Sequence, residues 1–307
     1  MKLILNSAKK EATPPKKLQE KKQRIAKIAC DLVGECIEKY PQVVGFELGG
    51  SYAKGTWIPE KPVDNVDIDI FVKFNKKTSE KDFRNIGTKI GFQSLKKHKP
   101  YTRHAEHPFV EAIIDGTRVN VVPCYDVNEG EWKSATDRSI YHTKFMLQKL
   151  SNSMKGDVRI LKKFLQHIEV YGAEIAKEGF SGYVTEALIF YFGSFEKTIK
   201  KISELKKGQV IGKSTKKFDS FVVIIDPIDN NRNLGTAISI ENLGKLVLAS
   251  RAFLRNPSKN FFKKPISKRI MKNTDKIIVV QFKVKERSDD IVWGQIKRAS
   301  NALKTQL

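Results

Sequence analysis

Two short motifs carry residue types that could perform phosphoryl-transfer chemistry. Gly49-Gly50-Ser51 follows an apolar run, and Asp67 and Asp69 are separated by one residue in the next apolar stretch. Two carboxylates at this spacing leave a strand on the same side, with Cα atoms about 6.5–7 Å apart, which suits Mg²⁺ held by carboxylates and substrate phosphates. A glycine-rich turn before a helix presents unpaired N–H groups, which with a serine hydroxyl can hold a triphosphate. Together the motifs predict a metal-dependent phosphoryl-transfer site.

Each motif alone has a less specific interpretation. A lone Asp-x-Asp is most often an exposed acidic pair on an edge strand, and a lone Gly-Gly-Ser is usually a turn. Their order along the chain is more specific than either part, because a strand precedes the glycines and the next strand carries the acids.

The elements around these motifs predict a sheet. Residues 43–48 are typical of a buried strand, and residues 66–73 alternate so that Asp67 and Asp69 share one face. Residues 109–114 and 117–122 flank Asp115-Gly116, a strong signal for a two-residue hairpin turn. That register places Glu111 directly opposite Asn120.

The remaining patterns are mainly helical. Residues 1–12 are interpreted as a flexible basic arm, and Thr13 as the N-cap of a helix that Pro14 and Pro15 would begin. Apolar stripes with helical spacing follow, at residues 25–40, 158–168, 184–199, 243–253 and 291–303, with a late strand at 277–284. The pattern predicts a mixed α/β head and a mostly helical second half, divided near residue 151.

The charge balance indicates a polyanionic partner. Lys and Arg number 57 against 34 Asp and Glu, a net charge of +23 in 307 residues. Nucleic acid is the favoured partner, since phosphates neutralised by basic side chains release counterions. An anionic membrane surface and plain solubilising charge are the alternatives.

The three cysteines and the absence of long apolar runs argue against a secreted or membrane-spanning protein. Cys30, Cys36 and Cys124 form no CxxC pair and no disulfide framework. The sequence predicts neither a signal peptide nor a run of about 20 apolar residues. We therefore expect an intracellular, cytoplasmic protein that does not bind a membrane.

At these motifs the sequence resembles the DNA polymerase β-like nucleotidyltransferases, and more narrowly the archaeal class I CCA-adding enzymes, which are tRNA nucleotidyltransferases. The resemblance is carried first by residues 50–57 (GSYAKGTW) and 67–71 (DIDIF). Similar blocks follow in the same order at residues 105–109, 121–125, 133–138, 171–174, 179–183 and 226–233. The resemblance therefore covers the chain from about residue 13 to residue 262.

This resemblance implies an architecture and an activity. The architecture is a polymerase β-like α/β head at residues 1–151, a helical neck at 152–262 and the start of a body domain at 263–307, with the family's tail absent. The activity is the addition of CMP and AMP to the 3′ end of tRNA from CTP and ATP, with Mg²⁺ as cofactor and release of pyrophosphate. The oligomeric state stays open, with a homodimer among the options.

The resemblance also implies roles for individual residues. Asp67 and Asp69 would bind metal, while Arg232 would read the base edge of CTP or ATP. The other implied nucleotide-binding residues are Gly50, Ser51, Lys54, Arg138, His142, Lys162 and Tyr171.

Each of four of these residues has an ordinary structural alternative. Lys162 could be a solvated residue at a helix flank, Tyr171 a core aromatic residue and His142 a structural side chain. Arg232 could merely pair with Asp226 or Asp229.

Asn120 departs from the family pattern at a catalytic position. Relatives have a third aspartate there, which helps bind metal and activates the 3′-hydroxyl, whereas an amide is a neutral ligand without useful basicity. A barrier increase on the order of 3 kcal/mol would follow. The substitution could be engineered, could mark a slow or inactive protein, or could be compensated by Glu111, the least favoured option because of the ~5 Å sideways reach.

Two smaller departures and two other functions complete the sequence-based hypotheses. Lys54 replaces a usual arginine and Ser139 a usual threonine, and a missing tail predicts weaker tRNA affinity. The alternative functions are a poly(A)-type or oligonucleotide-synthesising transferase and a catalytically silent RNA-binding protein, the latter favoured by Asn120.

Overall fold

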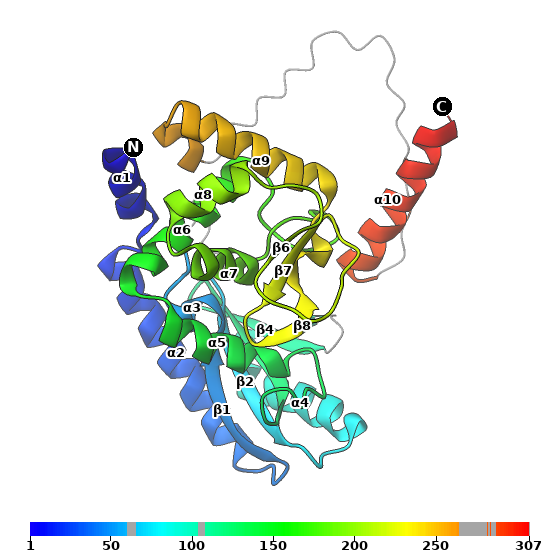
Figure 1. Cartoon of the computed structure of the whole chain (residues 1–307). Helices are drawn as coiled ribbons and strands as arrows, with labels where there is room; N and C mark the ends of the chain where they lie inside the picture. The colour runs from blue at the N-terminus through cyan, green and yellow to red at the C-terminus, as the bar shows by residue number, and fades with distance from the viewer. Residues whose placement is uncertain (60–65, 104–107, 264–280, 282, 284–286, 307) are drawn as a thin grey trace.

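A five-stranded mixed sheet forms the first half of the protein in the computed structural model, which describes residues 1–59, 66–103, 108–263, 281, 283 and 287–306 (Figure 1). The strands are β1 (Val43–Gly49), β2 (Ile68–Asn75), β3 (Tyr101–Arg103), β4 (Phe109–Ile114) and β5 (Thr117–Asp126). They lie in the order β1-β2-β5-β4-β3, with β2 and β5 parallel and the other pairs antiparallel.

The predicted hairpin and its register are confirmed. Glu111 lies opposite Asn120 in the β4–β5 pair. Asp115 and Gly116 have φ values of 47° and 72°, which the favoured two-residue hairpin turn requires at both central positions.

Helices cover both faces of this sheet. On one face α2 (Lys16–Ile37) and α4 (Glu80–Ser94) bury Ile68, Ile70 and their neighbours in one apolar cluster. On the other face α5 (Asp137–Lys149) packs Ile140 against Phe71 and Val122. The alternation along β2 therefore leaves Asp69 on the α5 side.

Residues 1–12 are helical, so the prediction of a flexible arm is wrong. They form α1 (Lys2–Ala12), which packs on α6 (Asn152–His167) and buries Leu5, Ala8 and Ala12. Lys9 also forms an ion pair with Asp157 at 2.9 Å. The apolar stripe is short and lies among lysines, and its partner helix is about 150 residues away, so local periodicity did not reveal it.

Thr13 ends α1 and does not cap α2, which corrects the predicted N-cap. Its hydroxyl donates to the carbonyl of Lys9 at 2.7 Å. The next helix begins at Lys16 with Pro15 in the capping position. Pro14 and Pro15 do lie at the start of α2, as predicted, but Thr13 caps the C-terminus of α1.

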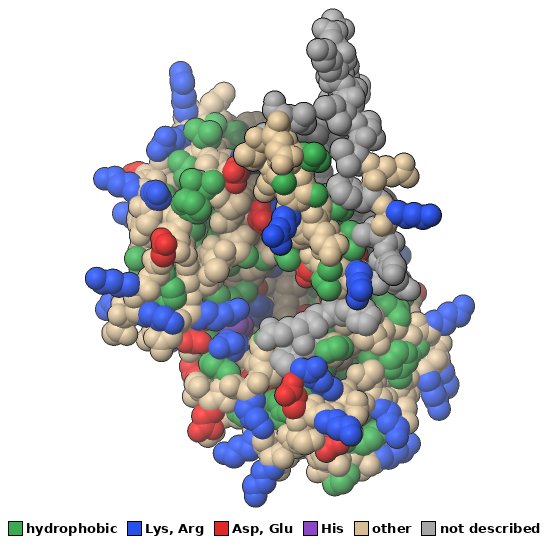
Figure 2. Space-filling model, turned by 90° about the vertical axis from the view of Figure 1, so that its right-hand side faces the viewer, with side chains coloured by type: hydrophobic (Ala, Val, Ile, Leu, Met, Phe, Trp, Pro, Cys, Tyr) green, Lys and Arg blue, Asp and Glu red, His purple; other side chains and the backbone are tan. Residues whose placement is uncertain are grey.

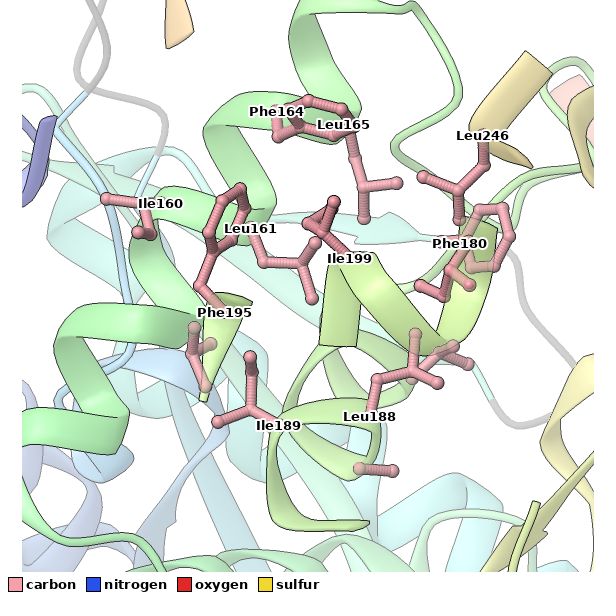
Figure 3. Packing of buried hydrophobic residues seen from close by; sticks show 14 of the residues in the cluster. Ile160, Leu161, Phe164, Leu165, Phe180, Leu188, Ile189, Phe195, Ile199 and Leu246 are labelled. Carbon is pink, nitrogen blue, oxygen red and sulfur yellow. The ribbon is translucent and has the colours of Figure 1, made fainter. Parts of the chain in front are cut away.

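The second half combines helices with a small sheet. Its helices α6, α7 (Gly182–Phe192), α8 (Phe195–Ser203) and α9 (Ile240–Arg255) share an apolar core (Figure 3). The stripe at residues 184–199 is divided between α7 and α8 at Gly193, whose φ is 84°. The strands β6 (Gln209–Ile211), β7 (Val222–Asp226) and β8 (Asp229–Asn233) were not predicted, although β7 is a short, fully buried apolar run.

The last described helix confirms the prediction for residues 291–303. This helix, α10 (Asp289–Gln306), contacts the preceding part of the chain through Lys297, which pairs with Glu178 at 2.7 Å. The predicted strand at 277–284 lies largely outside the described residues. Short 3₁₀ segments occur at η1 (Lys96–His98), η2 (Leu234–Ala237) and η3 (Lys259–Phe262). None of the described helices has the length and apolarity that crossing a membrane requires.

Candidate active site

A row of site residues crosses the sheet on the face that α5 covers. Strand register aligns Gly49 with Asp69, Asp69 with Asn120, and Asn120 with Glu111. Tyr101 of β3 continues the row beyond Glu111. The adjacent strands β1, β2, β5 and β4 therefore bring the glycine turn, Asp69, Asn120 and Glu111 side by side. Asn120 is the residue that differs from the family pattern.

The glycine turn lies directly against the second acid. β1 ends at Gly49 and the chain enters the short helix α3 (Gly50–Lys54). A Cβ on Gly49 would lie 2.4 Å from the Phe71 ring, and a Cβ on Gly50 would lie 1.9 Å from Oδ2 of Asp69. The φ of Gly50 is +68°, so both packing and backbone conformation require glycine there. Ser51 follows at the first turn of α3.

The acid pair carries more negative charge than its surroundings neutralise. Burial raises the pKa of Asp67 to about 6, with Asp69 adding to the rise, although Nε of Arg118 donates to Asp67 Oδ1 at 2.6 Å. Burial also raises the pKa of Asp69, against a hydrogen bond of 2.8 Å from Asn120 Nδ2 to Asp69 Oδ1. A nearby cation would relieve this unfavourable ionisation.

The oxygens around this pair fit a divalent metal. Oδ1 of Asn120 is buried and has no hydrogen-bond partner among the described residues, which is unusual for a buried polar atom. Two carboxylates and this amide oxygen are hard ligands of the kind that Mg²⁺ prefers. No three His, Cys, Asp or Glu side chains converge as a metal site in the described part of the chain.

Glu111 lies beside Asn120 but is engaged on its other side. Its carboxylate accepts a hydrogen bond from the Tyr101 hydroxyl and lies 3.9 Å from Nε of Arg103. Both partners belong to β3, at the edge of the sheet away from Asp69. This arrangement gives no support to compensation by Glu111, which stays a prediction to test.

Two predicted nucleotide-binding lysines meet at a buried glutamate. Lys54 Nζ lies 2.5 Å from Glu186 Oε2, and Lys162 Nζ lies 3.9 Å from Oε1 and donates to the Thr56 carbonyl at 3.0 Å. Burial lowers the pKa of Lys162 to about 8. Lys162 is fully buried, so its interpretation as a solvated flank residue is wrong. The cluster joins the end of the glycine turn to α6 and α7.

Two further predicted residues share a buried aspartate. Oδ2 of Asp226 lies 2.9 Å from both His142 Nε2 and Arg232 Nη1, and its Oδ1 accepts from the Tyr183 hydroxyl at 2.9 Å. Burial acts to raise the pKa of Asp226, but the hydrogen bonds from His142, Ile228 and Arg232 lower it overall. The pairing of Arg232 with Asp226, one alternative from the sequence, is therefore present.

The other two predicted residues lie nearby. Nε of Arg138 pairs with Asp229 Oδ2 at 3.2 Å, and its guanidinium lies 5.6 Å from the Trp132 ring centre. A Cβ on Gly182 would lie 3.1 Å from the Tyr171 hydroxyl and 3.6 Å from Lys162 Nζ. Tyr171 therefore adjoins the Lys162 cluster.

Sequence reasoning missed the residues that hold the predicted ones in place. Glu186 is a single acid in an apolar helical stripe, and a lone buried acid needs a cationic partner. Its nearest cation is Lys54 at 2.5 Å, and Lys162 lies farther away at 3.9 Å. Arg118 gave no such signal, because its pairing with Asp67 depends on the parallel β2–β5 register.

Basic side chains surround the recess between the two halves of the molecule. Figure 2 shows a hollow between the upper and lower parts, with Lys and Arg side chains around it and several Asp and Glu side chains among them. Such a surface suits a polyanion.

The fold and the site together define a nucleotidyltransferase. A model for a nucleotidyltransferase domain matches residues 29–143, and one for the second domain of tRNA nucleotidyltransferases matches residues 156–263. A nucleotidyltransferase implies a divalent metal, and the acid pair is where the described residues fit one. Among solved structures, the RNA terminal uridylyl transferase Cid1 is similar, with a TM-score of 0.64 at 12% identity over 86% of this chain and 98% of Cid1. At that identity the likeness concerns the fold alone, a mixed α/β polymerase β-like architecture.

Closer relatives are archaeal. The chain is 35% identical to the CCA-adding enzyme of Pyrobaculum islandicum over 310 residues, 98% of this chain and 71% of the relative. It is 38% identical over 252 residues to that of Picrophilus torridus, and these cover 81% of this chain and 57% of the relative. For that of Sulfurisphaera tokodaii the identity is 36% over 304 residues, 96% of this chain and 70% of the relative. The chain belongs to the family of archaeal CCA-adding enzymes.

Proposed function

We propose that this protein is a template-independent tRNA nucleotidyltransferase that transfers CMP and AMP from CTP and ATP to the 3′ end of tRNA and releases pyrophosphate. The observation that carries the proposal is the contact between the glycine turn and the acid pair, where Gly50 leaves no room for a Cβ beside Asp69. A phosphate held at the turn would lie next to the carboxylates. Membership of the CCA-adding family supports the choice of RNA and nucleotides.

In this proposal the nucleotide lies between the glycine turn and the Asp226 group. Gly50, Ser51 and Lys54 take the phosphates, with Lys162 and Tyr171 close behind the turn. Arg138 and His142 on α5 would also contact the nucleotide phosphates. Arg232 faces the base, since Asp226 fixes one of its nitrogens and leaves the remaining N–H groups to pair with a base edge.

Asp67, Asp69 and the amide oxygen of Asn120 would hold the divalent metal, Mg²⁺ in this proposal. When bound, the metal would stabilise charge on the transferring phosphoryl group and lower the pKa of the RNA hydroxyl. Asn120 cannot accept the proton of that hydroxyl, because an amide has no useful basicity. Solvent or another group must take it, and the chain should work slowly.

The RNA would lie along the basic surface of the second half. Residues 195–218 hold eight lysines against two glutamates, and we propose that they contact the acceptor arm. The proposal keeps the division into a head at 1–151, a neck at 152–262 and the start of a body at 263–307, and places the protein in the cytoplasm.

Incorporation of labelled CTP and ATP into tRNA lacking its terminal CCA tests the function. We expect CTP to be incorporated before ATP, with a faster rate for Asn120→Asp. Incorporation of ATP alone would indicate a poly(A)-type transferase instead. Glu111→Ala should leave the rate within about threefold, and a large loss would revive compensation by Glu111.

A catalytically silent RNA-binding protein is the second candidate, and two observations favour it. Asn120 replaces the third carboxylate, and Arg118 already pairs with Asp67 at 2.6 Å. This candidate predicts tRNA binding that weakens steeply with salt but no incorporation by the wild type with Mg²⁺ or Mn²⁺.

A further inference from the structure

Tyr183, in the first turn of α7, lies between the glycine turn and the Asp226 group, where the nucleotide lies in the proposed function. Its hydroxyl donates to Oδ1 of Asp226 at 2.9 Å, and its ring stacks on the His142 ring with 3.7 Å between the centroids. Toward the glycine turn, Lys54 Nζ lies 5.4 Å from the centre of the Tyr183 ring. Tyr183 therefore connects the two groups of side chains.

The helix α7 holds Tyr183 in a fixed position relative to the phosphate-binding residue Lys54. Residues three apart on a helix are neighbours on its surface, so Tyr183 and Glu186 lie on one face of α7. Glu186 accepts a hydrogen bond from Lys54 Nζ at 2.5 Å. Leu188 and Ile189, farther along α7, are buried in the apolar core (Figure 3). One anchored helix therefore supports both ends of the proposed nucleotide site.

The Tyr183 hydroxyl fixes the direction in which Asp226 presents its carboxylate. Oδ1 accepts from Tyr183 at 2.9 Å and from the backbone N–H of Ile228 at 3.1 Å. Oδ2 lies 2.9 Å from both His142 Nε2 and Arg232 Nη1. Burial and the charge of Asp226 raise the pKa of the Tyr183 hydroxyl, so this group stays protonated and donates. With both oxygens engaged, the carboxylate cannot turn without breaking its bond to Arg232.

Arg232 depends on this carboxylate for its orientation. Its side chain is 42% exposed, and Asp226 holds one of its nitrogens. Another N–H of the guanidinium, aimed at a base, can pair with the ring nitrogen acceptor of cytosine or adenine, whereas it opposes the ring N–H of uracil or guanine. Discrimination between these bases therefore depends on how rigidly the guanidinium is held.

We propose that Tyr183 is a positioning residue for base selection, which acts through Asp226 to hold Arg232 against the base of the incoming nucleotide. The inference rests on the proposed function and deepens it by naming a residue that sets nucleotide specificity. Without the hydroxyl, Oδ1 of Asp226 keeps only the bond from the backbone of Ile228 among the contacts described above. The guanidinium then gains freedom to turn, and it opposes uracil or guanine less strongly.

Tyr183→Phe removes the hydroxyl and keeps the ring on His142. Its kinetics are measured on CCA-less tRNA in the Asn120→Asp background. The ratio of kcat/KM for CTP to that for UTP should fall about tenfold, as expected for one hydrogen bond that matters only with the correct base. The kcat for CTP should fall by less than about threefold, since the phosphate contacts are unchanged. A CTP:UTP ratio within about twofold of the parent's would overturn the proposal.

Tyr191→Phe is the matched control. Tyr191 lies on the same helix, and its hydroxyl donates at 2.8 Å to the backbone carbonyl of Ile225, the residue before Asp226. Both variants should lose a similar amount of thermal stability, because each loses one hydrogen bond to β7, but Tyr191→Phe should keep the discrimination of the parent. An equal loss of discrimination in both variants would assign the effect to loosening of α7 and overturn the role of Tyr183.

Equilibrium binding separates this role from the proposed function. The full wild-type chain is mixed with CCA-less tRNA that ends in a 3′-deoxynucleotide and cannot be extended, and Kd is measured for CTP and for UTP. Tyr183→Phe should narrow the ratio of these Kd values about tenfold. Incorporation of CTP with unchanged discrimination in Tyr183→Phe would overturn the role of Tyr183 and leave the function intact. A narrowed Kd ratio without any incorporation would overturn the function and leave the role intact.

Discussion

The partly buried pair Asp67 and Asp69 and the fully buried Asp226 have opposite electrostatics. Asp67 and Asp69 lie near each other on the head sheet, and burial together with like charge raises the pKa of Asp67 to about 6. Asp226, fully buried between α5, α7 and β8, receives hydrogen bonds from His142, Tyr183, Arg232 and the backbone of Ile228. Its pKa is lowered despite burial, because donors surround it.

The opposite directions of these pKa shifts distinguish a site that needs a cation from an acid whose hydrogen bonds are already complete. An acid whose charge the protein does not neutralise destabilises the folded state. Binding of a cation or substrate then restores that free energy. An acid that the protein fully satisfies contributes stability and orients its donors. The same residue type thus marks a metal site at Asp67 and Asp69 and, at Asp226, a fixed support for His142 and Arg232.

The largest effect is expected at Asp69. Asp69→Asn should lower nucleotide incorporation by about 10³-fold or more, since the charge that holds the metal is lost. The same change should raise the free energy of unfolding by about 1 kcal/mol, because it removes a buried like charge. Incorporation assays and thermal unfolding measure both, and a loss of stability would contradict the contrast between the two groups.

Asp226→Asn should act in the opposite direction on stability. We expect a loss of about 3 kcal/mol, since breaking a buried ionic pair leaves Arg232 without its counter-charge. Urea unfolding checks this value. Asp229→Asn is the matched control and should cost less, because Asp229 is partly exposed and has one longer ion pair, to Arg138 at 3.2 Å.

Asn120→Asp restores a third acid to the row. The rate of CMP incorporation should rise by about 10²-fold, the reverse of the barrier cost expected for the amide. Stability without metal should fall, since a third carboxylate adds to the repulsion around Asp69. A variant that is both faster and more stable would contradict this view of the head site.

The smallest effect concerns pH. The folded pKa of Asp67, about 6, lies above the ordinary aspartate value of 3.8. Its ionisation therefore destabilises the folded state fully above pH 6 and not at all below the unfolded pKa. Asp67→Asn should therefore be more stable than the wild type at pH 8 by about 1 kcal/mol, a value reduced for the partial exposure of the side chain. The gap should close as the pH falls through 6 toward 4, and a gap that widens in acid would contradict the assignment.

Local patterns predicted the parts of the fold in which short-range geometry decides the outcome. The alternation around Asp67 and Asp69 and the Asp115-Gly116 turn specify a strand and a hairpin by themselves, and the register of Glu111 with Asn120 follows from the turn. The Gly49-Gly50-Ser51 pattern also predicted the turn, and the structure gives the reason for the glycines, because no space for a Cβ remains beside Phe71 and Asp69.

Contacts between distant segments could not be derived in this way. The helix at Leu5 depends on α6, and the Lys162–Glu186 pair depends on how α6 and α7 cross. The roles of His142 and Arg232 came from the family resemblance, whereas their common partner Asp226 appears only when β7 meets α5. Charge partners of buried groups are thus the part of a site that periodicity does not reveal.

The packing of α1 on α6 also constrains the order in which the protein can fold. The whole head sheet lies between these helices in the sequence, and loop closure over such a distance is slow compared with hairpin formation. An intermediate with a completed head but no second half leaves Leu5, Ala8 and Ala12 without their partners. We therefore expect α1 to be among the last segments to dock.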